Sequence, residues 1–237
     1  MARLAPMPPI EIPEDELLLF GQTWTERGGR LSRTPPYSSG ELGLVFDRAV
    51  GRALATLLGG LAIVAPSSGS LIPPQRDCVE VGPVRIIGGV RPQNFDVGYR
   101  PDGVRFAFDS KTLNDSDSVG KNWQNMVNDL ATEATTVHSR FPHALVAFMF
   151  IVPKPCIGDA RRLAITETLE RLARREEVNG PAHMAEAVSF VLWDPTTGII
   201  DPELPSSSSP PRIERFSTIV EAIYRSRYKG LPPHATD

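Results

Sequence analysis

Two aspartates and a lysine stand close together in the stretch NFDVGYRPDGVRFAFDSK, as Asp96, Asp109 and Lys111. Paired carboxylates can hold a hard divalent cation such as Mg²⁺, and a lysine adds positive charge beside them. Hydrolysis of a phosphodiester needs both, because water must be activated and the charge that develops on the phosphate must be stabilised. The three side chains are therefore the candidate catalytic group, if the fold brings them together.

A predicted β-hairpin would bring them together. Residues 95–100 and 104–113 are strand-like runs that flank Arg-Pro-Asp-Gly, in which proline and glycine favour a tight turn. Alternation along the second strand puts Asp109 and the lysine on one face and Ser110 on the other. A turn at the Pro-Asp-Gly segment sets Asp96 opposite Asp109, whereas a register shifted by one residue makes the two aspartates diagonal neighbours.

A surface hairpin with a weak cross-strand ion pair is the alternative interpretation, and such a pair contributes less than about 1 kcal/mol. Phe95, Phe106 and Phe108 argue against it, because they indicate strands at the centre of a sheet. The literal Pro-Asp pair ends in Asp102, but this residue falls in the turn, about 20 Å of strand from Asp109. We therefore interpret Asp102 as a turn residue.

The segments around the hairpin predict an α/β fold. Spacings of three and four between apolar residues predict helices, whereas valine- and isoleucine-rich runs predict strands. The expected helices are 41–58, 119–137, 160–175 and 213–227, and the further strands are 78–90, 144–152 and 187–193. The strand that follows each middle helix implies a crossover, so we expect a mixed β-sheet with helices on both faces.

Composition divides the chain into three parts. Residues 1–40, rich in proline, glycine and acids, are expected to form an irregular N-terminal arm with an apolar anchor at 17–20. Residues 41–205 form the expected core. Residues 206–237 comprise a flexible spacer, SSSSPP, and a last helix packed on the core.

The hairpin segment resembles the signature of the PD-(D/E)XK nuclease superfamily, an acid on one strand and a D/E-x-K triplet on the next. That family has an αβββαβ core, and the elements expected between residues 41 and 152 have the same order. The resemblance implies that Asp96, Asp109 and the backbone carbonyl of Ser110 bind Mg²⁺, for which Mn²⁺ substitutes, and that Lys111 orients or helps to deprotonate the attacking water. Phe95 stands where the family has its proline.

Many members of the family carry a further acid on the first helix, in a pattern similar to G-x-x-F-E. The run from Gly43 to Asp47 resembles that pattern, with aspartate in place of glutamate, so Asp47 is the candidate third acid. Glu41 competes for this role, but with Ser38 it also forms a capping box, which explains it without catalysis.

Phosphate contacts need clustered positive charge, and the net charge of −3 means that it must be gathered locally. Two arginine-rich regions are available, and acids are interleaved in the first, so the second is the better DNA candidate. The first region contains Arg161, Arg162, Arg171, Arg174 and Arg175, and the second contains Arg212, Arg215, Arg225, Arg227 and Lys229. Lys121 and Gln124, early in the helix after the hairpin, could also face the phosphate.

Other functional classes have little support in the sequence. No apolar run could span a membrane and the first residues do not form a signal peptide, so we expect a cytoplasmic protein. The two cysteines lie far apart, the four histidines lack metal-ligand spacing, and no phosphate-binding loop or nucleophile elbow is present.

The resemblance implies a type II restriction endonuclease that cuts double-stranded DNA at a specific sequence and leaves 5′-phosphate ends. Cleavage of both strands implies a homodimer, and a cognate DNA methyltransferase would be encoded nearby. Two alternatives remain open: a structure-directed or repair nuclease of the same fold, and a protein that binds nucleic acid without cleaving it.

Overall fold

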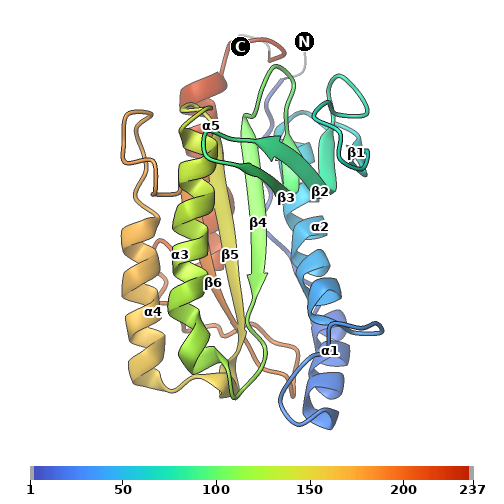
Figure 1. Cartoon of the computed structure of the whole chain (residues 1–237), viewed down its shortest axis with the longest axis vertical. Helices are drawn as coiled ribbons and strands as arrows, with labels where there is room; N and C mark the ends of the chain where they lie inside the picture. Colours follow the sequence, from blue (N-terminus) through green and yellow to red (C-terminus); the bar gives the residue numbers. More distant parts are fainter. Residues whose placement is uncertain (1–2, 235–237) are drawn as a thin grey trace.

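One mixed sheet of six strands organises the chain, whose residues 3–234 are described by a computed structural model (Figure 1). The helices are α1 Glu14–Glu26, α2 Ser39–Leu57, α3 Val119–His138, α4 Asp159–Leu172, α5 Ile213–Tyr228 and a 3₁₀ turn, Lys154–Cys156. The strands are β1 Ile63–Val64, β2 Val79–Ile87, β3 Pro92–Tyr99, β4 Phe106–Thr112, β5 Leu145–Pro153 and β6 Ala187–Trp193.

The strands lie in the order in which they occur along the chain. β2, β3 and β4 pair antiparallel, whereas β4, β5 and β6 are parallel and β1 is parallel to β2. Every residue of β5 and β6 is buried, which explains their unbroken apolar sequences. The predicted α/β fold with a mixed sheet is confirmed.

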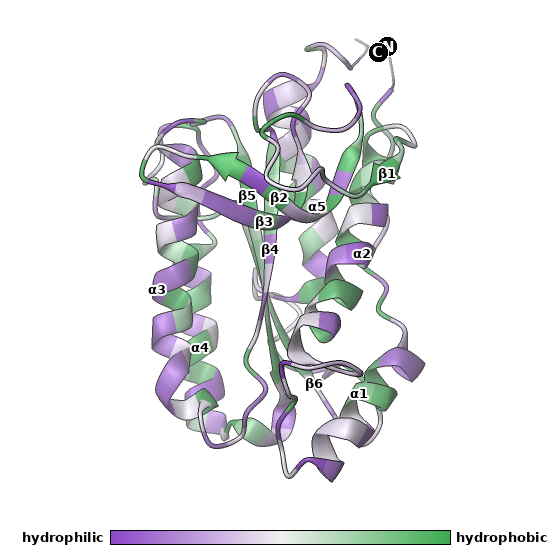
Figure 2. Cartoon of the chain, turned by 45° about the vertical axis from the view of Figure 1, so that its right-hand side comes forward, coloured by the Kyte–Doolittle hydropathy of each residue, from purple (hydrophilic) through white to green (hydrophobic). Residues whose placement is uncertain are grey.

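Helices cover both faces of the sheet, as predicted (Figures 1 and 2). Phe108 of β4 packs edge-to-face on Phe216 of α5, and Ser110 lies under Gly43 of α2, so α2 and α5 share one face. Helices α3 and α4 lie on the other face of the sheet, where Lys111 pairs with Glu133 of α3. None of the helices in residues 3–234 is both long and apolar enough to cross a membrane.

The hairpin of β2 and β3 bends away from the rest of the sheet. A bulge between Val81 and Val84 interrupts its register, and Gly82 there has a φ of 132°, which favours glycine. β2 and β3 stay paired as far as Pro92, whereas the last pair between β3 and β4 is Val97 with Phe108. Figures 1 and 2 show the resulting two-stranded ribbon crossing β4 steeply.

One expectation about an irregular segment was wrong. The N-terminal arm contains α1, which buries Leu17, Phe20 and Trp24. The short strand β1 was not predicted. In the spacer before α5, the hydroxyl of Ser209 donates to Oε1 of Glu170 at 2.5 Å.

Candidate active site

The strands β3 and β4 part at the two aspartates of the predicted motif, and we call this place the strand fork. Continuing the register beyond the last pair sets Asp96 opposite Asp109, as predicted. Because β3 no longer pairs with β4 at this position, the N–H of Ser110 donates to Oδ2 of Asp96 at 2.9 Å instead of to a carbonyl of β3. Since N–H and C=O of one strand residue point the same way, the Ser110 carbonyl faces the fork as well.

Lys111 lies between two carboxylates on the α3 face of the sheet. Its Nζ donates to Oδ2 of Asp109 and to Oε1 of Glu133, the latter at 2.8 Å. Both acids are almost fully buried, with 8% and 7% of their side chains exposed. Period-two alternation explains why Asp109 and Lys111 share this face, and Glu133 reaches them from α3.

Asp47 approaches the fork from the opposite face of the sheet. It lies on α2 between Gly43 and Gly51, four residues from each, so the three share one side of the helix. A Cβ at Gly43 would lie 3.0 Å from the Ser110 hydroxyl, and one at Gly51 would lie 2.4 Å from Val81. The two glycines therefore let α2 lie close to the strands, which buries Asp47 beside Ser110.

The carboxylates at the fork perturb one another. Burial and the charge of Asp96 together raise the pKa of Asp47 to about 8, although a hydrogen bond with the Ser110 side chain opposes the shift. Burial also raises the pKa of Asp96 to about 8, and a hydrogen bond to Asp109 adds to this shift. The pKa of Asp109 is raised to about 6, again by burial, while Asp96 and Lys111 oppose the shift. The acids are therefore close together and short of positive charge.

Lys111 shows the reverse behaviour. Burial alone would lower its pKa, but the charges and hydrogen bonds of Asp109 and Glu133 outweigh burial and raise the pKa above its ordinary value. The lysine therefore stays protonated, as a fixed positive charge between two acids.

The donor set suits a hard divalent cation such as Mg²⁺. It consists of carboxylate and carbonyl oxygens, and two buried carboxylate oxygens, Oδ1 of Asp47 and Oε2 of Glu133, have no hydrogen-bond partner. Within residues 3–234, no three His, Cys, Asp or Glu side chains are already gathered around a common point suited to a metal ion. The oxygens of Asp96 and Asp109 are instead turned to Ser110 and Lys111.

Several other residues singled out in the sequence lie outside the fork. Glu41 forms the predicted capping box with Ser38, and Asp102 lies in the turn, where it pairs with Arg105. Lys121 and Gln124 are exposed near the start of α3.

The C-terminal arginines are not the free cationic surface that we expected. Arg212 donates to the carbonyls of residues 201, 202 and 205, and Arg225 donates to those of residues 4 and 5. Arg227 pairs with the buried Glu186. These three side chains hold the C-terminal helix on the core, whereas Arg215 and Lys229 of the same predicted group are exposed.

Sequence reasoning missed Glu133 and a second charged group. Glu133 occupies a position in the apolar stripe of α3, between Leu130 and Val137, and an acid in such a stripe is a detectable signal. The second group, which we call the Glu186 cluster, joins Glu186 to His138, Arg175 and Arg227. Its members come from four separate segments, so no spacing in the sequence reveals it.

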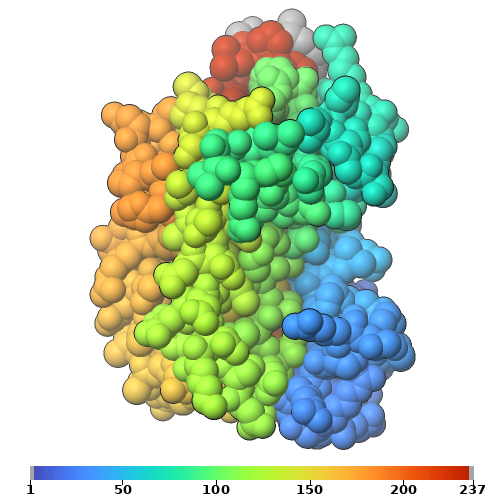
Figure 3. Space-filling view, in the orientation of Figure 1, coloured from blue at the N-terminus to red at the C-terminus, as the bar shows by residue number. Residues whose placement is uncertain are grey.

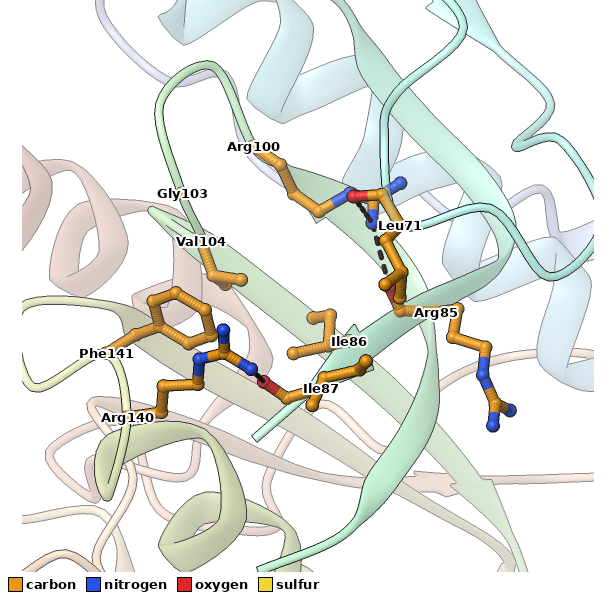
Figure 4. Close-up of a pocket in the computed structure, with 9 residues that line it drawn as sticks. All are labelled: Leu71, Arg85, Ile86, Ile87, Arg100, Gly103, Val104, Arg140 and Phe141. Atoms are coloured by element: carbon orange, nitrogen blue, oxygen red, sulfur yellow. Dashed lines mark hydrogen bonds between the residues drawn. The ribbon is translucent and has the colours of Figure 1, made fainter. Parts of the chain in front are cut away.

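A pocket near the hairpin turn lies apart from the fork (Figure 4). It measures about 170 Å³ and is bordered by Arg85, Arg100, Arg140 and Phe141. The guanidinium of Arg100 is satisfied by Glu80 and by two carbonyls, and Arg140 donates to the carbonyl of residue 87. These two arginines therefore already have partners, and the pocket offers little to an anionic ligand.

Comparison with known proteins gave no match to any family model, curated protein or solved structure.

Proposed function

We propose that this protein is a metal-dependent nuclease of the PD-(D/E)XK type, acting as a restriction endonuclease on double-stranded DNA. The observation that carries the proposal is the strand fork, where three acids that are short of positive charge, Asp47, Asp96 and Asp109, lie together with Lys111. Perturbed acids around one lysine are typical of catalytic sites. The element order from α2 to β5 supports the same proposal, because it follows the family's αβββαβ order once the additional two-residue strand β1 is set aside.

Mg²⁺ would be held by Asp96, Asp109 and the Ser110 carbonyl, with Asp47 as a further acid, and would supply Lewis-acid charge to the scissile phosphate and activate water. Attack of water on phosphorus would break the bond from phosphorus to the 3′ oxygen, and a proton lost by the water would end on that oxygen, which leaves 5′-phosphate and 3′-hydroxyl ends.

In this mechanism Lys111 acts as a fixed cation. Its ammonium group would stabilise the negative charge that develops on the phosphate, and Glu133 would keep it in place if Asp109 held the metal. Glu133 is therefore a positioning residue. Burial of both acids keeps bulk water away, which strengthens each of these interactions.

The first test is cleavage of unmethylated phage DNA by the purified protein with and without Mg²⁺. We expect discrete bands that disappear without metal and in Asp109→Asn, which should lose at least about a thousandfold in rate. Asp102→Asn is the matched control, since this acid belongs to the same hairpin but lies in the turn.

Each outcome of this test has a distinct meaning. A metal-dependent smear in place of bands would replace restriction by a structure-directed or nonspecific nuclease. DNA that stays intact in every reaction would overturn the nuclease proposal. Equal cleavage by Asp109→Asn and the wild type would remove the strand fork from the chemistry.

A further inference from the structure

A groove beside the strand fork carries two arginines, and neither forms an ion pair with any of residues 3–234. It lies between α2 and the edge of the sheet at β1, measures about 430 Å³, and is lined by Leu44, Arg48, Arg52, Ile63 and Val81 among others. No acidic side chain lines it. Figure 2 shows α2 beside β1, and we call this feature the α2–β1 groove.

Arg48 and Arg52 form one row on α2, because residues four apart share a helix face. Both are exposed, and neither makes a hydrogen bond or an ion pair through its side chain with the residues that the structure describes. In this they differ from Arg212 and Arg225, whose guanidinium groups donate hydrogen bonds to carbonyls and acids.

The row lies next to the site. Arg48 follows Asp47 directly on α2, so the row of arginines begins next to the acid that approaches the fork. β1 is the last strand of the sheet on this side, and the exposed side chain of Ile63 adds an apolar contact. The groove thus offers two guanidinium groups, which can each donate two hydrogen bonds to a phosphate, and an apolar wall. This combination suits a sugar-phosphate backbone.

We propose that the α2–β1 groove binds the phosphate backbone of the substrate DNA beside the scissile bond, through Arg48 and Arg52. This inference rests on the proposed nuclease function and names the surface by which the substrate is held. A chain of net charge −3 needs such local positive charge to bind DNA at all. In the space-filling view, the β4 region is visible between α3 and α2, so DNA seated along α2 passes the fork (Figure 3).

The test measures binding apart from cleavage. A short fluorescein-labelled duplex is titrated with Asp109→Asn protein and with the same protein carrying Arg48→Gln and Arg52→Gln, over a series of salt concentrations. Loss of two phosphate contacts should flatten the slope of log K against log salt by about two units and weaken binding about tenfold at low salt. Arg171→Gln on α4 is the matched control, an exposed arginine that pairs only with Glu167.

An unchanged slope and affinity in the double variant, with circular dichroism showing intact helices, would overturn the inference while leaving cleavage by the wild type to support the nuclease. Equal competition by polyglutamate and by unlabelled duplex would assign the groove to an acidic protein partner instead. If the wild type neither cuts nor binds DNA, the proposed function fails and the inference fails with it.

Discussion

Two buried clusters of charged side chains differ in how their charges are balanced. In the Glu186 cluster one carboxylate accepts from Arg175, Arg227 and the ring of His138. At the strand fork four carboxylates share Lys111, which reaches two of them. Burial is similar in the two places, so the difference lies in the ratio of positive to negative groups.

The pKa values follow that ratio. Burial would raise the pKa of Glu186, but the hydrogen bond and charge of His138 and the charge of Arg227 outweigh burial and lower it. At the fork, burial and neighbouring acids raise the pKa of Asp47 and Asp96 to about 8. The charges of the Glu186 cluster are balanced within the chain, whereas under the proposed function the excess negative charge at the fork would be balanced by a bound cation.

The largest expected effect is on the balanced cluster. Glu186→Ala leaves two arginines buried without their carboxylate and should lower the free energy of unfolding by about 3–5 kcal/mol, measured in guanidinium chloride. Asp47→Ala, made at the fork, should not destabilise comparably. Similar losses in the two variants would mean that the clusters do not differ in kind.

A smaller effect is expected on the pH dependence of stability, to which Asp47 and Glu186 should contribute in opposite directions. An acid with a raised pKa binds a proton on folding, so Asp47 should make the metal-free protein less stable as pH rises from 3.8 to about 8. Asp47→Asn should remove part of that decline and stabilise the protein at pH above 8 by on the order of 2 kcal/mol.

Glu186, whose pKa is lowered, should contribute in the other sense. Its stabilisation is fully present above the ordinary glutamate pKa of 4.5 and is lost as pH falls below that value. Unfolding curves across pH for Asp47→Asn and Glu186→Gln measure both slopes. Slopes of the same sign at the two clusters would contradict the comparison.

The smallest effect concerns Glu133, the acid at the fork that pairs with Lys111. Glu133→Gln keeps the shape and should lower kcat about tenfold with little change in KM, because Lys111 loses the negative charge that positions it. Glu133→Asp should recover part of the rate. A change confined to KM, or none, would show that Lys111 keeps its place without Glu133.

Local pattern predicted most of the fold. The alternation around Asp109, the stripe of α3 and the buried run of β5 each specify one element, and the turn specified the hairpin register. Helix α1 was missed because prolines and acids surround its apolar residues, although Leu17, Phe20 and Trp24 keep helical spacing.

The candidate site was predictable only in part. Asp96, Asp109 and Lys111 lie on one hairpin, where spacing alone brings them together, and the run from Gly43 pointed to Asp47. Glu133 left a signal, an acid inside the apolar stripe of α3, but its pairing with Lys111 depends on how α3 packs on the sheet. The C-terminal arginines were predicted to form a cationic surface for the same reason. Composition cannot distinguish an exposed guanidinium from one that donates to backbone carbonyls, as that of Arg212 does.

The hydrogen bond from Ser110 to Asp96 has a spectroscopic consequence. Most amides in a sheet are protected by the neighbouring strand, but this one is held by the carboxylate of a side chain. Its chemical shift and its rate of hydrogen exchange should follow the charge and position of Asp96 alone. One resonance in an NMR spectrum would thus report, in solution, on anything that neutralises or displaces that carboxylate.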